Sequence, residues 1–106
     1  MEPLVDQAAQ DDLADALGAE DFADLITRFF QQLPELTERI VTAMRAGDAV
    51  AVGKAGHTLK GAAINLGFVR LSADAHRIEL AGKGGNAQVA DLLDILRATA
   101  EASRPR

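Results

Sequence analysis

Hydrophobic residues recur along the 106-residue chain at steps of three and four positions, the spacing of one face of an α-helix. The longest of these apolar stripes extends from Phe22 to Met44, over about six turns. Pro34 lies inside this stripe and is expected to kink or divide the helix, because proline lacks an N–H and crowds the preceding turn. Arg45 and Gly47 then mark the end of the helix.

Further stripes predict the remaining helices. A weaker helix is expected from Val5 to Leu17, ended by Gly18. After Asp48, a plausible N-cap, one stripe comprises Val52, Ala55, Leu59, Ala62 and Leu66, and the next comprises Phe68, Leu71, Ala75, Ile78 and Gly82. A glycine-rich turn at 82–85 leads to a last helix that Asn86 can cap, with Val89, Leu92, Leu93, Leu96 and Ala100 facing inward. The pattern predicts an all-α fold, an up-down-up-down antiparallel four-helix bundle with a short additional N-terminal helix.

Composition narrows the class of protein. Hydrophobic residues make up 48% of the chain and charged residues 25%, which predicts one globular domain spanning residues 1–106. The chain has no cysteine, which excludes disulfides and thiolate metal sites. No apolar run approaches the roughly 20 residues needed to cross a bilayer, and the acidic N-terminus is unlike a secretory or mitochondrial leader. We therefore expect a cytoplasmic protein without a membrane partner, and Met1 favours a free-standing domain over a fragment of a hybrid kinase.

The charge is distributed unevenly. The net charge of −5 argues against nucleic acid as a partner. Residues 1–52 carry eleven acids and three bases, whereas residues 53–106 carry five acids and eight bases. No Asp or Glu occurs from residue 49 to residue 73. Chance in a stretch rich in alanine and glycine could explain this gap; the alternative is that an anion or an acidic partner binds here.

The acid-free segment contains His57, whose position in the stripe predicts an exposed imidazole. His57 is two positions from Ala55 and from Leu59, about 200° around the helix from these core positions. On the same outer face, three or four positions away, lie Gly53, Lys54, Lys60 and Gly61. A neutral imidazole near pH 7 can attack a phosphoryl group, and a lysine one turn away can stabilise the added negative charge.

The glycines of this helix strengthen the prediction of a functional surface. Each glycine inside a helix costs about 1 kcal/mol relative to alanine. Gly56 lies toward the core and is best explained by a close approach of two helices. Gly53 and Gly61 flank His57, where the absence of a side chain gives a large partner room to reach the imidazole.

The run from Gly56 to Gly67, GHTLKGAAINLG, closely resembles the core motif of histidine-containing phosphotransfer (HPt) domains. The resemblance extends forward to Glu79 and backward through Phe29, and it is weakest after Gly82. Alanine replaces a common small hydroxyl residue at position 62 or 63 and a frequent cysteine at position 75, which are changes between small residues. The resemblance implies that His57 is the phospho-acceptor, that Lys60 supports the phosphoryl group and that Gly61 leaves clearance for the partner.

The same resemblance implies the partners. HPt domains take a phosphoryl group from an aspartyl phosphate on a response-regulator receiver domain, possibly one in a hybrid histidine kinase, and pass it to another receiver. The receiver is expected to supply Mg²⁺, and no cofactor is expected in this chain, which should act as a monomer and lack kinase activity. The expected docking residues are Gly53, Lys54 and Ile64. His76 and Arg77 should lie near the level of His57, with His76 an ordinary surface residue.

Two other classes of protein fit less well, and one alternative stays open. A histidine kinase would need an ATP-binding domain and a phosphate-binding glycine loop, for which the chain has no room. A metal hydrolase would need more ligands than His57 and His76, the two histidines of the sequence. The remaining alternative is a non-catalytic helical adaptor that docks a receiver without accepting phosphate, although an adaptor would not need the set of His57, Lys60 and Gly61.

Overall fold

The computed structural model describes residues 3–82 and 86–105, without the side chains of residues 86 and 87. Beyond Gly82, the turn predicted at 82–85 lies outside the described residues, as does the side chain of Asn86. The described residues form five helices and no strand: α1 (Gln7–Leu17), α2 (Ala19–Arg45), α3 (Ala49–Asn65), α4 (Val69–Ala81) and α5 (Asn86–Ser103). None of the helices in this part of the chain combines the length and the apolar character needed to cross a membrane.

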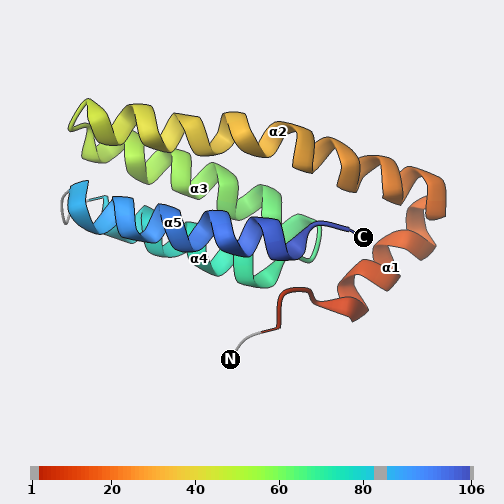
Figure 1. Ribbon diagram of the computed structural model, residues 1–106. Helices are drawn as coiled ribbons and strands as arrows, with labels where there is room; N and C mark the ends of the chain where they lie inside the picture. The colour runs from red at the N-terminus through yellow and green to blue at the C-terminus, as the bar shows by residue number, and fades with distance from the viewer. Residues whose placement is uncertain (1–2, 83–85, 106) are drawn as a thin grey trace.

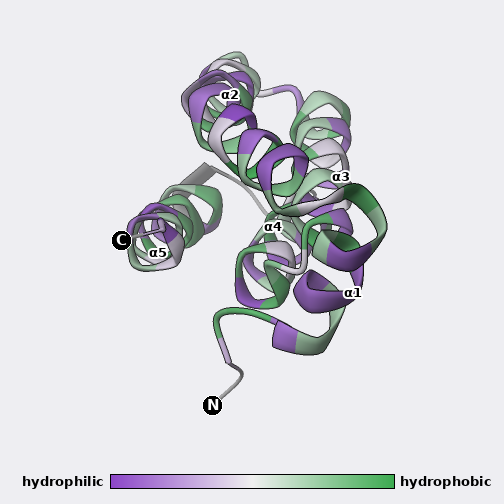
Figure 2. Ribbon diagram, turned by 90° about the vertical axis from the view of Figure 1, so that its right-hand side faces the viewer, coloured by the Kyte–Doolittle hydropathy of each residue, from purple (hydrophilic) through white to green (hydrophobic). Residues whose placement is uncertain are grey.

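Helices α2 to α5 run alternately up and down, and α1 lies outside them at one end (Figures 1 and 2). Each of these helices packs against the next in the chain, and α5 returns to α2. The largest fully buried side chains come from all four: Ile40, Leu59, Leu71, Ile78, Val89, Leu93 and Leu96. The expected four-helix bundle with an extra N-terminal helix is confirmed.

Helix α2 passes through Pro34 without a break, so of the two expected outcomes the helix is not divided. Pro34 lies on the exposed side of α2, so its ring does not enter the core. Figure 1 shows α2 changing direction near its middle, as expected for a proline inside a helix. The buried face of the helix continues on both sides of the proline, through Phe30, Leu33 and Thr37.

The buried face of α3 is rotated from the one expected. Its buried residues are Val52, Gly56, Leu59 and Ala63, whereas Ala55, Ala62 and Leu66 are only partly buried. The cause is the close approach of α4, which packs along the side of α3 that carries Gly56. Glycine and alanine at this contact let the backbones of the two helices come close together. A prediction based on the positions of large apolar residues misses such a contact.

The short helix α1 is held against the turn between α3 and α4. The backbone N–H of Asp6 donates to the carbonyl of Gly67 over 2.8 Å, and the amide Nε2 of Gln10 donates to the carbonyl of Leu66 over 2.9 Å. Gly67 has φ of 81°, a left-handed conformation that disfavours a side chain. These contacts fix the end of the α3–α4 pair, the two helices that carry the site described below.

Replacing Gly56 by alanine is expected to destabilise the fold by about 1–2 kcal/mol. A Cβ atom at Gly56 would lie 2.9 Å from the backbone nitrogen of Glu79 and 3.1 Å from the carbonyl oxygen of Ala75, so the helices would have to move apart. Gly61→Ala is the matched control, because a Cβ there would meet nothing within 4 Å and should add up to about 1 kcal/mol of stability. Urea denaturation of both variants measures the difference, and equal stabilities would contradict the close approach at Gly56.

Candidate functional site

The site is centred on His57, which α3 holds on the outer face of the bundle. Asp48 begins this helix, since its side chain accepts a hydrogen bond from the backbone N–H of Ala51 over 3.0 Å. The side chain of His57 is 66% exposed, so the predicted outward orientation is confirmed. A large partner could therefore reach the imidazole without any rearrangement of the bundle.

The carboxylate of Glu79, on α4, joins three side chains into one cluster. Its Oε2 atom lies 2.8 Å from Nδ1 of His57. Its Oε1 atom lies 2.7 Å from Nζ of Lys60 and 3.0 Å from Nδ1 of His76. We call His57, Lys60, His76 and Glu79 the carboxylate cluster. Both imidazole rings and the ammonium group of Lys60 therefore share one carboxylate as their hydrogen-bond partner.

These partners keep Glu79 ionised. The hydrogen bond from Lys60, then that from His76, with smaller contributions from His57 and from the charge of Lys60, lower the pKa of Glu79 from 4.5 to about 2, against the opposing effect of partial burial. An ionised carboxylate only accepts hydrogen bonds, so the neutral imidazole of His57 must carry its proton on Nδ1. The Nε2 atom of His57 is then left with a free lone pair on the exposed ring.

The closeness of α3 and α4 makes this cluster possible. The backbone of Glu79 lies directly against Gly56, so the two helices meet with no side chain between them at the level of His57. Glycine at position 56 therefore brings the carboxylate within hydrogen-bond reach of both His57 and Lys60. The expectation that Gly56 serves a tight helix–helix contact is confirmed, and this contact also places the functional group.

The lowered pKa of Glu79 predicts a loss of stability in acid. A carboxyl group whose pKa is lower in the folded state stabilises the fold fully above its unfolded value, and this contribution disappears as the pH falls toward the folded value. The contribution of Glu79 should therefore be lost between about pH 4.5 and pH 2. Unfolding free energies measured across this window should fall more steeply for the wild type than for Glu79→Gln. Glu38→Gln, at an exposed carboxyl group on α2, is the control and should retain the wild-type slope.

The other residues expected at the site lie around the cluster. Lys60 is paired with Glu79 rather than extended alone beside His57, and its side chain is 28% exposed. Gly61 faces open space, since a Cβ there would meet nothing within 4 Å. Among the expected docking residues, Lys54 and Ile64 are exposed, and Gly53 is partly buried. All of them lie on α3 with His57.

Two residues had not been assigned to the site. His76 was expected on the surface, and its side chain is indeed exposed; its hydrogen bond to Glu79 also links it to the carboxylate cluster. Glu79 matched the family pattern but was given no role. A count along the α3–α4 hairpin could have found it: His57 is ten residues before Gly67 and Glu79 is twelve residues after, within one turn of the same level.

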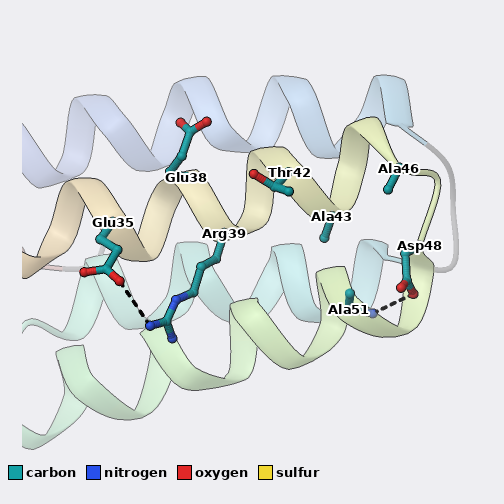
Figure 3. A pocket seen from close by; sticks show the side chains of 8 residues that line it. All are labelled: Glu35, Glu38, Arg39, Thr42, Ala43, Ala46, Asp48 and Ala51. Atoms are coloured by element: carbon teal, nitrogen blue, oxygen red, sulfur yellow. Dashed lines mark hydrogen bonds and ion pairs between the residues drawn. The ribbon is translucent and has the colours of Figure 1, made fainter.

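The surface has a shallow depression beside His57, toward the beginning of α3. It is lined by Ala49, Val50, Gly53, Lys54, His57, Thr58 and Glu79. Another depression lies between α2 and the first turn of α3 (Figure 3), and no member of the carboxylate cluster lines it. Within the described ranges, no group of three or more His, Cys, Asp or Glu side chains is arranged to hold a metal ion.

Comparisons with known proteins bear on the family and the fold of the chain. The family model of the Hpt domain matches residues 24–104, more than half of the chain. The fold is similar to the crystal structure of histidine-containing phosphotransfer protein B (HptB) from Pseudomonas aeruginosa PAO1, with a TM-score of 0.86 and 24% sequence identity, over 98% of this chain and 90% of that one. Among curated proteins, none matches the sequence significantly.

Proposed function

The chain belongs to the Hpt domain family, which performs histidine phosphotransfer in phosphorelays, and on this premise we propose that His57 is the residue that carries the phosphoryl group. The observation that supports this assignment is the hydrogen bond from Nδ1 of His57 to the ionised carboxylate of Glu79. It leaves Nε2, on an exposed ring, as the nucleophile. His76 also bonds to Glu79 through Nδ1, but it lies outside the sequence motif that resembles the HPt core.

The proposed step needs no proton transfer. The lone pair of Nε2 forms a bond to phosphorus as the bond from phosphorus to the aspartyl oxygen of the receiver breaks, and the electron pair leaves with the aspartate. The imidazole ring of His57 becomes positively charged while Nδ1 keeps its proton. Glu79, 2.8 Å from Nδ1, stabilises this positive charge. Transfer to the next receiver reverses the step and returns the electron pair to Nε2.

The neighbours of His57 are proposed to serve the phosphoryl group and the partner. Lys60 lies one turn after His57 and would meet the negative charge of the bound phosphoryl group. Gly61 would leave space for the receiver, since no contact within the bundle requires a glycine at this position. Gly53, Lys54 and Ile64 would form part of the docking surface, and one copy of the chain presents all of these residues, so we propose that it acts as a monomer.

The receiver is proposed to bring the remaining chemistry. A receiver that carries an acidic pocket and Mg²⁺ would be repelled by unpaired carboxylates near His57. The segment from 49 to 73 contains no carboxylate, and Glu79, which lies beside His57, is bonded to Lys60 and to both imidazole rings. The bundle would contribute a nucleophile held in a fixed position, which is an effect of proximity and orientation. We propose that the chain is a phosphocarrier with no kinase activity of its own, so ATP alone should leave it unmodified.

The direct test is to incubate the purified chain with Mg²⁺ and a phosphorylated receiver and to measure its intact mass. We expect a gain of one acid-labile phosphoryl group, located at His57 by fragmentation. Incubation with ATP and Mg²⁺ but no receiver is the control and should give no gain. A chain that binds several phosphorylated receivers without gaining the group would instead be an adaptor.

A further inference from the structure

Most of the exposed large hydrophobic side chains lie on the two helices that carry the site. Among the described residues, the exposed large hydrophobic side chains are Leu17, Val50, Ile64, Leu80 and Ile95. Three of these five lie on α3 and α4. Val50 is 68% exposed and precedes His57 by seven residues, and Ile64 is 48% exposed and follows it by seven. This spacing places both on the same face as the imidazole, each about 10 Å along the helix.

Val50 borders the depression beside the imidazole of His57. Val50 and His57 both line the depression, together with Gly53 between them. A Cβ at Gly53 would meet only the carbonyl oxygen of Glu79, at 3.6 Å, an ordinary contact. Packing within the bundle therefore does not require glycine at this position, although glycine inside a helix costs about 1 kcal/mol. The absence of a side chain keeps the depression accessible from outside.

The charges around the depression favour an acidic partner. Lys54 lies in its lining, and the one carboxylate there, Glu79, is already bonded to Lys60, His57 and His76. The depression on the other side of α3 differs, because three carboxylates and one arginine line it (Figure 3): Glu35, Glu38 and Arg39 of α2, and Asp48, which caps α3. An acidic surface that approaches His57 is thus attracted on the side of α4 and repelled on the side of α2.

Building on the proposed function, we propose that Val50 and the depression beside it receive an apolar side chain from the rim of the acidic pocket of the receiver. Val50 is then a docking residue two turns before His57, and it extends the interface by about one turn from Gly53 toward the beginning of α3. The occupant is a receiver with an apolar residue next to its acidic pocket. Apolar contacts around a polar reacting centre exclude water from the site of transfer.

Val50→Glu tests this proposal without loss of the fold. Val50 is the second residue of α3, where a carboxylate interacts favourably with the helix dipole, so helix content should be retained. The variant should bind the receiver at least about tenfold more weakly and accept phosphate from it correspondingly more slowly, because an apolar contact is replaced by a charge that repels the acidic pocket. Phosphoramidate, a small phosphodonor that needs no docking, should label His57 in the variant at the wild-type rate.

Ile95→Glu is the matched control, since it places the same charge at an apolar residue that is 47% exposed on α5, a helix that does not pack against α3 among the described residues. It should retain wild-type binding and transfer. Wild-type transfer by Val50→Glu would overturn the docking role of Val50. Slow labelling of that variant by phosphoramidate as well would also overturn it, because the effect would then lie in the site itself. Failure of both donors to label wild-type His57 would instead refute the proposed function.

Discussion

His57→Gln is expected to abolish phosphorylation of the chain while leaving the bundle folded. Glutamine has no nucleophilic ring nitrogen, so no bond to phosphorus can form at position 57. The side chain of His57 is 66% exposed, and substitutions at exposed positions usually change stability by no more than about 0.5 kcal/mol. Glu79 keeps Lys60 and His76 as partners. Intact mass after incubation with a phosphorylated receiver and Mg²⁺ measures the loss, and circular dichroism checks the helix content.

His76→Gln is the matched control, because it removes the other imidazole from the same carboxylate. It should still gain one phosphoryl group. Phosphorylation of His57→Gln at a rate near that of the wild type would assign the acceptor role elsewhere, with His76 as the next candidate. A loss of helix content in His57→Gln would show that this histidine supports the fold, and a binding assay would then be needed to separate the two effects.

The first of these variants depends on an outer face of α3 that could be predicted from the sequence alone. His57 lies between Ala55 and Leu59 in the apolar pattern, and this local spacing is enough to direct its side chain outward. The order of the helices is equally local, since short connections between long stripes leave antiparallel packing as the simplest arrangement. Helix periodicity and turn length therefore accounted for the bundle and for the exposure of the proposed nucleophile.

Contacts between helices were harder to predict, because they depend on how closely two helices approach. The buried face of α3 is rotated toward Gly56, a residue without a side chain, so a search for large apolar residues underestimates this contact. The same approach brings Glu79 to His57 across 22 positions of sequence. The sequence predicted that Lys60 supports a phosphoryl group but not that its ammonium group is bonded to that carboxylate. Sequence spacing identified the residues of α3 but not the group on α4 that connects them.

The connecting role of Glu79 leads to the second large expected effect, a fall of about 10- to 100-fold in the rate of phosphotransfer in Glu79→Ala. Without the carboxylate, Nδ1 of His57 loses its acceptor, so the ring can also place its proton on Nε2 and lose the nucleophilic lone pair. The positive charge that develops on the ring also loses its counter-charge. Asp94→Ala, which removes an exposed carboxylate from α5, is the control and should transfer at the wild-type rate.

Glu79→Gln separates the two contributions of the carboxylate. The amide oxygen can still accept a hydrogen bond from Nδ1 of His57, so this variant should keep the proton on Nδ1 but lose the negative charge. Its rate should therefore lie between those of the wild type and Glu79→Ala. The ¹⁵N chemical shifts of the His57 ring report where the proton lies, which a purely structural role of Glu79 would not change. Equal rates in all three proteins would show that Glu79 does not act through His57, whereas a slow Glu79→Gln with its proton on Nδ1 would assign the effect to charge.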